Sequence, residues 1–254
     1  METLVRRKQL QVAVQNIQQR YGLLALTQGR PLFPGVEEVI PHISTGFSSL
    51  DEALGIGGLA RGRLSEIVGS ATSGKTTLAL QFLASAQARE GVVGYVDCLH
   101  ALDPDYAHRC GVDLQRLAVL SPHDSREALA VTEVAITNRA FAALVVDAPD
   151  DLWDNAAPSL AASIDRWMAP LHKAGTALVF LHAPVGSLTS SHRALAHYAS
   201  VRLYVACEHW LRHYRNIQGC QARVEILKNR LAAANRQATI QLSFHGTTPG
   251  DDRR

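Results

Sequence analysis

The 254-residue sequence lacks any apolar run long enough to cross a membrane, and its N-terminus lacks the apolar core of a secretory signal. It contains no low-complexity tract and no internal repeat. Its four cysteines, Cys98, Cys110, Cys207 and Cys220, form no Cys-x-x-Cys pair, so we interpret them as reduced thiols. Hydrophobic residues make up 47% of the chain, which at this length supports a sizeable core. These features predict a globular cytoplasmic protein without membrane association.

The formal net charge of +2 conceals two regions of opposite sign. Residues 91–160 are rich in acids, whereas residues 201–236 are rich in arginine and lysine. A basic C-terminal third fits the phosphates of a nucleotide or a nucleic acid. It fits an ordinary solvated face equally well.

One stretch matches a phosphate-binding sequence pattern, and the segments on both sides of it fit that pattern as well. It fits G-x-x-x-x-G-K-[ST], follows an apolar run at 63–68 that predicts a strand, and opens a predicted helix at 75–89. Strand, glycine turn and helix aim backbone N–H groups and the positive end of a helix dipole at one anion. We therefore predict a nucleoside triphosphate site that consists of Gly69, Ser70, Ala71, Thr72, Ser73, Gly74, Lys75, Thr76 and Thr77.

Three side chains are expected to complete this site. Lys75 should reach the β- and γ-phosphates, and the Thr76 hydroxyl should bind Mg²⁺. Asp147 ends the apolar run 142–147, at the strand end where α/β sheets bind ligands, and is expected to hold Mg²⁺ through water. The alternative for Asp147 is a plain strand-end cap.

From residue 43 onward, apolar strands and helices alternate. This alternation predicts an α/β fold with a mostly parallel central sheet flanked by helices, and the last strands, which lack intervening helices, predict an antiparallel edge. Residues 1–42 read as an N-terminal helical arm, with an apolar stripe over 8–21, and a linker rich in glycine and proline. The predicted core is 43–246, and 247–254 is a polar tail. The expected strands are 92–97, 117–120, 142–147, 176–182, 200–206, 221–228 and 238–244, and the further helices start near 104 or span 125–139 and 158–173.

Five segments in the same order resemble the RecA family of bacterial recombinases. They are "ISTGFSSLDEALGIGGLARGRLSEIVGSATSGKTTLALQ" (43–81), "YVDCLHALDPDYAHRCGVD" (95–113), "LVVD" (144–147), "HYASVRL" (197–203) and "ILKNRLAA" (226–233). The resemblance implies a RecA-type P-loop core that binds ATP and Mg²⁺. Residues 8–22 are similar to the family's N-terminal helix, which docks on the adjacent subunit of a filament. The resemblance covers most of 8–245 and does not include the separate C-terminal domain of the long recombinases.

The resemblance also implies roles for individual residues. Asp103 and Tyr106 fall where the family contacts and stacks on adenine. Lys228 and Arg230 fall where two lysines reach the γ-phosphate of the neighbouring protomer, and arginine keeps the charge. The alternative is that both are surface bases on an edge strand.

Three departures from the family concern hydrolysis. Leu99 stands where a glutamate activates the attacking water, and leucine cannot accept a proton. Asp97 and His100 are neighbouring substitutes to consider. Ala148 replaces a serine, and His182-Ala183 replaces the Asn-Gln pair that senses the γ-phosphate. The parts for binding are retained, whereas those for hydrolysis and coupling are lost.

The predicted DNA-binding loops are also reduced. The first is short and acidic, with Asp150, Asp151 and Asp154, which repel a phosphate backbone. Trp153 there is either a stacking residue or a packing anchor. The second loop, 184–196, keeps His192 and Arg193 as candidate contacts to DNA.

The segment "HWLRHYR" (209–215) has several interpretations. His209 and His213, four residues apart, would share one face of a helix and could hold a metal. The segment also fits a basic-aromatic surface for nucleic acid or protein, or a plain amphipathic surface.

The favoured interpretation is an ATP-binding accessory or regulatory RecA paralogue in DNA recombination and repair, within an SOS-type response to DNA damage. Such a short form is similar to ImuA-type proteins, which accompany translesion polymerases in some bacteria. Residues 8–21 would assemble it with itself, with a recombinase or with a translesion polymerase, and single-stranded DNA binding would be weakened. The alternatives are an active single-stranded-DNA-dependent ATPase that promotes strand exchange, and an ATP-switched assembly protein without DNA contact.

Overall fold

The computed structural model describes residue 9 and residues 12–16, 19–20, 39–88, 91–149, 157–184, 190–214 and 216–244. The chain divides into two units, Met1–Val39 and Ile40–Arg254. The described residues of the first unit before Val39 are helical. Most of the predicted arm and linker, and the predicted tail 247–254, lie outside the described residues.

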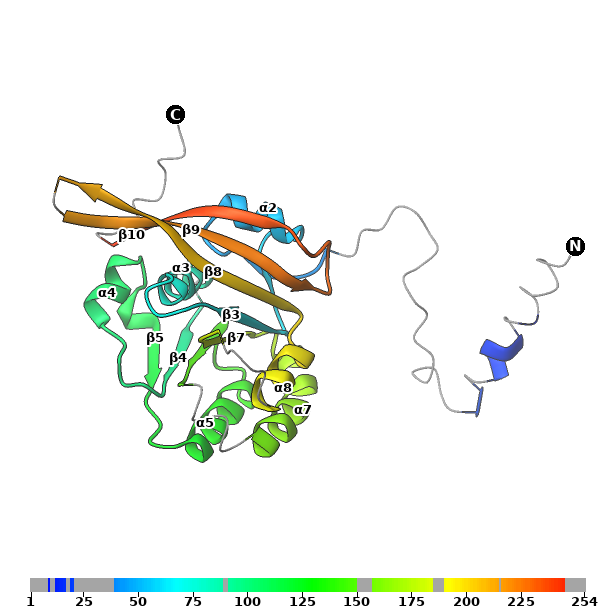
Figure 1. The fold of residues 1–254 in the computed structure, drawn as a ribbon. Coiled ribbons are helices and arrows are strands. Elements are labelled where there is room, and N and C mark those ends of the chain that lie inside the picture. The colour runs from blue at the N-terminus through cyan, green and yellow to red at the C-terminus, as the bar shows by residue number, and fades with distance from the viewer. Residues whose placement is uncertain are drawn as a thin grey trace, which may run out of the picture. The chain divides into compact units, whose positions relative to one another are not determined.

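The second unit alternates strands and helices along most of its length (Figure 1). Its elements in chain order are β1 (His42–Ile43), α2 (Ser48–Leu54), β2 (Leu59–Ala60), β3 (Leu64–Val68), α3 (Lys75–Gln87), β4 (Val93–Asp97), α4 (Pro104–Arg109), the 3₁₀ turn η2 (Leu114–Arg116), β5 (Leu117–Leu120), α5 (Ser125–Thr137), β6 (Ala143–Asp147), α7 (Ala157–Ala174), β7 (Ala177–His182), α8 (Ser190–Tyr198), β8 (Val201–His213), β9 (Asn216–Asn229) and β10 (Gln237–Ser243).

The described part of the chain contains one large sheet in the strand order β10-β9-β8-β3-β7-β6-β4-β5. Strands β8 to β5 in this order pair in parallel. Strands β9 and β10 pair antiparallel at one side, and β1 and β2 form a separate antiparallel pair. The predicted α/β fold with a mostly parallel sheet and an antiparallel edge is therefore confirmed.

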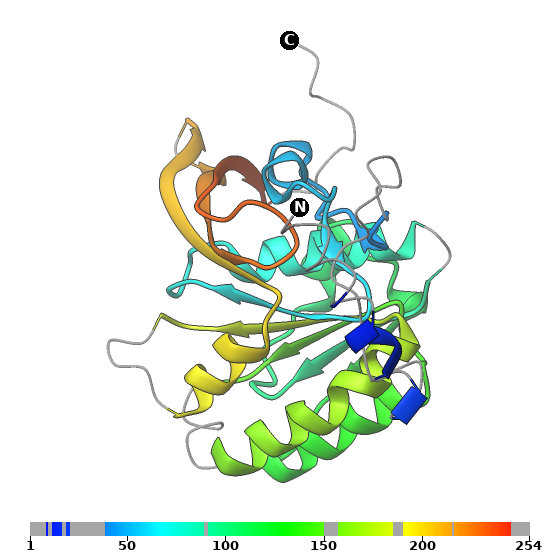
Figure 2. The ribbon, with the colours of Figure 1, turned by 90° about the vertical axis from the view of Figure 1, so that its right-hand side faces the viewer.

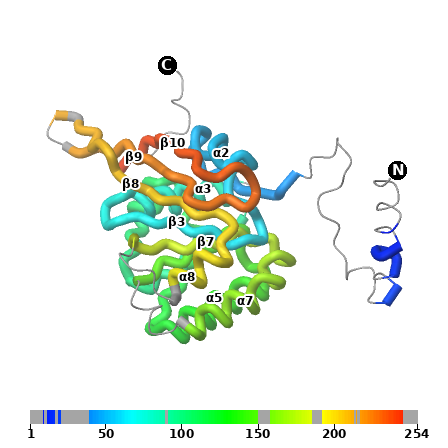
Figure 3. The backbone as a smooth tube through the Cα atoms, turned by 45° about the vertical axis from the view of Figure 1, so that its right-hand side comes forward, coloured from blue at the N-terminus to red at the C-terminus, as the bar shows by residue number. Residues whose placement is uncertain are grey.

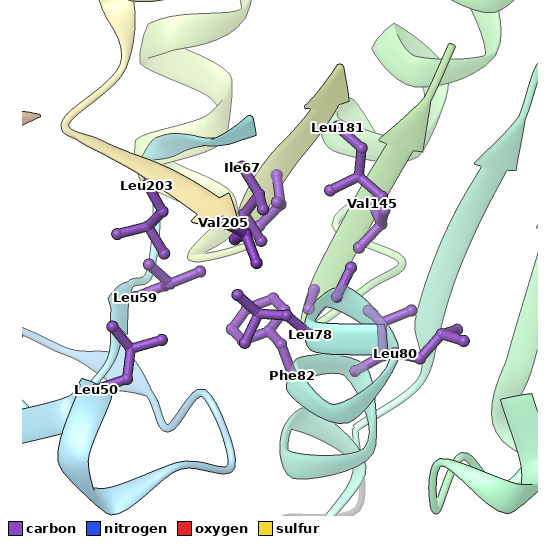
Figure 4. Close-up of a cluster of buried hydrophobic side chains, with 14 of the residues drawn as sticks. Leu50, Leu59, Ile67, Leu78, Leu80, Phe82, Val145, Leu181, Leu203 and Val205 are labelled. Atoms are coloured by element: carbon purple, nitrogen blue, oxygen red, sulfur yellow. The ribbon is translucent and has the colours of Figure 1, made fainter. Parts of the chain in front are cut away.

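Helices cover both faces of the sheet, as Figure 2 shows with α5, α7 and α8 below the strands. Helices α2 and α3 pack on the opposite face, where Leu78, Phe82 and their neighbours meet the strands (Figure 4). A second buried cluster joins α5, α7 and α8 to the other face and includes Trp167. Each face therefore has its own hydrophobic layer.

Strand β6 shows why the apolar runs in the sequence are continuous. Ala143 and Val145 belong to the cluster under α3, whereas Leu144 and Val146 belong to the cluster under α5 and α7. Successive side chains of a strand point to opposite faces, so a strand covered on both sides needs apolar residues at every position. Asp147 is the first polar residue, where the strand leaves the core.

The carboxyl ends of the parallel strands meet at one edge of the sheet. Asp97 of β4 pairs with Asp147 of β6, and Val68 of β3 pairs with His182 of β7. Polar residues that are far apart in sequence are therefore neighbours at this edge. In open α/β sheets this is the edge that binds ligands.

The C-terminal hairpin corrects one prediction. Residues 201–213 form strand β8, which is longer than the predicted 200–206, so the expectation that His209 and His213 share a helix face is wrong. The alternation of buried Val201, Leu203 and Val205 continues into a strand that pairs with β9. Four residues along a strand span about 13 Å, too far for two side chains to hold one ion. The described residues contain no group of three or more His, Cys, Asp or Glu placed to hold a metal.

The sequence predicted no membrane association, and the described helices can be compared with that expectation. Among the described segments, no helix combines the length and apolarity needed to cross a bilayer.

Trp167 provides a test of the layer formed by α5 and α7. Its side chain is fully buried, and its indole N–H donates to Glu133 of α5 over 3.3 Å. Trp167→Ala should lower the free energy of unfolding by about 3–5 kcal/mol, because the helices cannot close the cavity that it leaves. Urea unfolding followed by circular dichroism measures this loss. Val134→Ala, at a 59% exposed position of α5, should change it by less than about 0.5 kcal/mol. A similar loss in both variants would contradict the packing.

Candidate functional site

The loop Gly69–Thr77, called the glycine loop below, connects β3 to the start of α3. Its first N–H group donates to the carbonyl of His182 over 3.2 Å, and Ser73 N–H donates to Ser70 O over 3.2 Å. Gly74 precedes α3 with φ of 93°, in the left-handed region that glycine adopts without strain. The loop is thus attached to the end of β7 and folded back on itself.

Close packing requires glycine at both ends of the turn. A Cβ atom at Gly69 would lie 2.8 Å from the carbonyl oxygen of Val205, and one at Gly74 would lie 2.1 Å from the Cδ1 of Leu242. These contacts tie the loop to β8 and β10. The backbone can approach a ligand closely here because no side chain intervenes.

The first turn of α3 provides donors for an anion. The helical ladder starts with Leu78 N–H, which donates to Gly74 O over 2.9 Å. The N–H groups of the preceding helical residues have no carbonyl one turn earlier in the helix. Free N–H groups and the positive end of the helix dipole favour a phosphate at this position.

A cavity of about 290 Å³ adjoins the glycine loop. Nine residues singled out from the sequence line it together: Lys75, Thr76, Leu99, Asp103, Tyr106, Asp147, Ala148, His182 and Ala183. The Lys75 ammonium donates to Ser70 O over 3.4 Å at its rim. The sheet edge and the glycine loop therefore form one pocket from residues between 75 and 183.

Asp147 is held by a tyrosine that the sequence did not indicate. The Tyr95 hydroxyl donates to Asp147 Oδ2 over 2.6 Å. Burial raises the pKa of Asp147 above its usual value, while the hydrogen bond from Tyr95 and the charge of Lys75 act in the opposite direction. Burial also raises the pKa of Tyr95, which therefore remains a donor. Tyr95 fixes the orientation of the carboxylate.

The residues present fit a magnesium ion. Mg²⁺ takes oxygen ligands and keeps several waters, and the Thr76 hydroxyl and the Asp147 carboxylate line the same cavity. A bound ion would neutralise charge on the nucleotide phosphates. Thr76 and Asp147 are the residues that would hold it, directly or through water.

Asp103 and Tyr106 also line the cavity, at the start of α4. The Asp103 carboxylate accepts the N–H groups of Asp105 and Tyr106, which caps the helix. The Tyr106 hydroxyl and the Thr77 hydroxyl share a hydrogen bond of 2.6 Å, and the Arg109 guanidinium lies 5.5 Å from the ring centroid. Burial raises the pKa of Tyr106 to about 12. The ring is thus anchored to α3 in a position that a base can stack on.

Leu99 lines the cavity and is 47% exposed. The Asp97 carboxylate accepts N–H groups from Ala101 and Leu102, at 3.1 and 2.9 Å, and so holds the turn after β4. The His100 ring stacks near His123, with 6.2 Å between centroids. Neither Asp97 nor His100 is among the described residues that line the cavity.

A buried polar cluster lies beneath the end of β7. His182 Nε2 lies 3.5 Å from Glu66 Oε1, and both side chains are buried. The other oxygen of Glu66 accepts from the Arg202 guanidinium, and His192 of α8 meets the His182 ring edge-on at 5.0 Å. Sequence reasoning missed Glu66, although a glutamate inside the apolar strand "LSEIV" was a signal for a buried partner. Ala183 lines the cavity without a polar group.

Lys228 and Arg230 are engaged within their own chain. The Lys228 ammonium donates to Ala196 O and His197 O, at 2.5 and 3.0 Å, and Arg230 donates to His197 O over 2.7 Å. These bonds cap the last carbonyls of α8. Burial lowers the pKa of Lys228, and the charge of Arg230 adds to this effect.

The candidate DNA contacts lie in different surroundings. Arg193 is exposed on α8, whereas His192 is buried against His182. Asp150, Asp151, Trp153 and Asp154 lie outside the described residues, as do residues 185–189 of the second loop.

Comparison with known proteins identifies relatives over most of the chain. A family model described as the RecA N-terminal domain matches residues 8–159. "Protein RecA" of Rhizobium rhizogenes is 35% identical over 263 residues, which cover 93% of this chain and 72% of that protein. "Protein RecA" of Rhodococcus opacus is 35% identical over 262 residues, which cover 94% and 74%. That of Nitratidesulfovibrio vulgaris is 31% identical over 264 residues, which cover 94% and 73%.

Removing the Tyr95 hydroxyl tests the role of Asp147. Tyr95→Phe should raise the Mg²⁺ concentration needed for half-maximal nucleotide binding by about tenfold, because partners that orient a metal ligand typically contribute 10–100-fold to affinity. Titration of Mg²⁺ with a fluorescent ATP analogue measures this shift. Tyr204→Phe, on β8, is the matched control and should leave the midpoint unchanged. An unchanged midpoint in Tyr95→Phe, or an equal shift in both variants, would contradict the assignment.

Proposed function

The chain belongs to the RecA family, and we propose that it is an ATP-binding accessory or regulatory member with weak or absent ATP hydrolysis. RecA homologues support a role in DNA recombination and repair. The proposal is that this protein performs that role in the cytoplasm by assembling with itself, with a recombinase or with a translesion polymerase. Its place would be the response to DNA damage.

Support for ATP binding comes from the glycine loop and its cavity. Lys75 and the first turn of α3 would hold the phosphates, and Thr76 and Asp147 would hold Mg²⁺. Tyr106 would stack on the base, and Asp103 would contact it from the same helix end. Each assigned group already faces this one cavity.

The observation that carries the proposal is Leu99 in that cavity, where the acids near it among the described residues already have partners. Asp97 and Asp103 accept backbone N–H groups, and Asp147 accepts the Tyr95 hydroxyl. Loss of a general base typically lowers a rate by 10²–10⁴-fold. ATP would therefore act mainly through its binding and only weakly through its hydrolysis.

One observation favours the alternative of an active, single-stranded-DNA-dependent ATPase. His182 lines the cavity and lies against the Glu66 carboxylate, and a histidine oriented by a carboxylate is a common general base. This alternative predicts that His182→Ala lowers turnover. The third reading, an ATP-switched assembly protein without DNA contact, predicts no response to DNA at all.

Turnover measurements test the proposal directly. The unsubstituted protein should bind ATP but release phosphate near the background rate, with or without single-stranded DNA. Leu99→Glu should raise turnover by about 100-fold, at the low end of a general base's contribution. Leu99→Gln is the control, because it has a similar size but cannot take a proton. Robust DNA-stimulated phosphate release by the unsubstituted protein, lost in His182→Ala, would support the alternative instead.

The assembly part of the proposal rests on residues 8–21. Within the apolar stripe of this segment, Ile17→Asp should abolish association with a purified recombinase or translesion polymerase, because a charge would enter the apolar contact. Gln18→Asp, next to it and outside the stripe, should retain association. Pull-down with ATP binding as the folding control distinguishes them. Equal retention of the partner by both variants would count against docking through this segment.

A further inference from the structure

The hairpin of β8 and β9 extends beyond the strands that flank it. The pairing of β3 with β8 ends at Tyr204, and the pairing of β10 with β9 reaches only to Gly219. Beyond these points the two strands pair with each other as far as His213 and Asn216, and the ribbon projects from the sheet in Figures 1 and 3. We call residues 208–214 and 216–218 the hairpin tip. A two-stranded ribbon is marginally stable alone in water. Large apolar side chains exposed on it therefore call for an explanation, such as a binding partner.

Three large side chains are exposed on this tip. Trp210 is 41% exposed, Tyr214 is 92% exposed and Ile217 is 44% exposed. Single exposed apolar residues are ordinary on a protein surface, but several gathered on one short ribbon mark an interaction site. None of them lines the ATP cavity.

Trp210 is held in place while part of its ring stays accessible. Its ring centroid lies 6.1 Å from that of Phe244, at an angle of 53°. The contact with Phe244 restricts the rotamer of Trp210. An aromatic ring fixed in this way can stack on a flat partner with little loss of side-chain entropy.

The hairpin tip also carries an exposed cation, Arg212. Arg212 is exposed, and among the described residues no acid forms a salt bridge with it. Glu208, the acid of the hairpin tip, is bound by Arg223, which also contacts Glu225. Arg223 thus pairs with both of these acids, whereas Arg212 is exposed.

We propose that the hairpin tip binds single-stranded nucleic acid, with Trp210 and Tyr214 stacking on unpaired bases and Arg212 binding backbone phosphate. Aromatic platforms interleaved with cations are the usual means of holding single strands without sequence preference, because every base has a π-face. An apolar protein partner would not need the exposed cation beside the rings. None of the residues proposed for this site lines the ATP cavity.

Fluorescence of Trp210 tests the proposal in the full-length protein. In a Trp153→Phe background the remaining tryptophans are Trp167, which is fully buried, and Trp210. An oligothymidylate of about 16 nucleotides should quench the emission, because a base stacks on the exposed ring. In a labelled-oligonucleotide assay, Trp210→Ala should weaken binding by about tenfold, whereas Trp210→Phe should largely retain it.

Salt dependence tests the contact of Arg212 with phosphate. Arg212→Ala should reduce the slope of log K against log salt by about 0.7, the value for one phosphate contact on a single strand. Arg126→Ala removes an exposed arginine from α5 and should leave the slope unchanged. Unfolding midpoints and ATP binding should be unchanged in these variants. A parallel titration with an oligouridylate shows whether the tip binds RNA as well as DNA.

Three results would overturn the proposal. The first is the absence of quenching, and the second is an affinity for the oligonucleotide that neither Trp210→Ala nor Arg212→Ala changes. The third is that these variants lose binding to a purified recombinase or polymerase but keep their affinity for nucleic acid. The last result would make the tip a protein-docking surface.

Discussion

The arrangement of the site depends on two close contacts between the glycine loop and the ends of β8 and β10. At Gly69 the neighbour is the Val205 carbonyl, and at Gly74 it is the Leu242 side chain, with no room for a Cβ at either position. Because β9 and β10 belong to the antiparallel part of the sheet and β3 to the parallel part, the loop joins the two. The direction of its N–H groups is therefore set by the packing of the whole sheet, which makes it a rigid cradle for an anion.

The acids near the cavity are committed to other partners. Asp97 and Asp103 hold turns through backbone N–H groups, Asp147 accepts from Tyr95, and Glu66 accepts from Arg202. Each of these carboxylates thus already holds a turn or a neighbouring side chain in place. Leu99 is thus not compensated by a neighbouring acid among the described residues. The proposal of weak hydrolysis rests on this arrangement.

Local sequence patterns predicted most of the fold, because the features concerned depend on residues that lie within a few positions of one another in the chain. The glycine loop and the strand that ends at Asp147 are of this kind, and the parallel sheet followed from alternation. What the sequence could not show are contacts between distant residues: Tyr95 with Asp147 and Glu66 with Arg202 join elements that only the folded sheet brings together. The interpretation that placed His209 and His213 on one helix face failed for a related reason. A spacing of four suits a helix or a strand, and pairing with β9 decided between them.

Helix α8 shows how an ATP site without a water-activating acid can still do work. Its first half contacts the cavity through His192 and His182, and its last carbonyls are capped by Lys228 and Arg230. The family pattern directs those two bases toward a phosphate on the next subunit. A phosphate is a stronger acceptor than a carbonyl, so such a contact would draw the bases away and leave the end of α8 uncapped. In an assembly of that kind, the helix would lie between its own nucleotide and a neighbour's. Binding alone would shift its equilibrium, because a ligand changes populations through differential affinity and needs no turnover to do so.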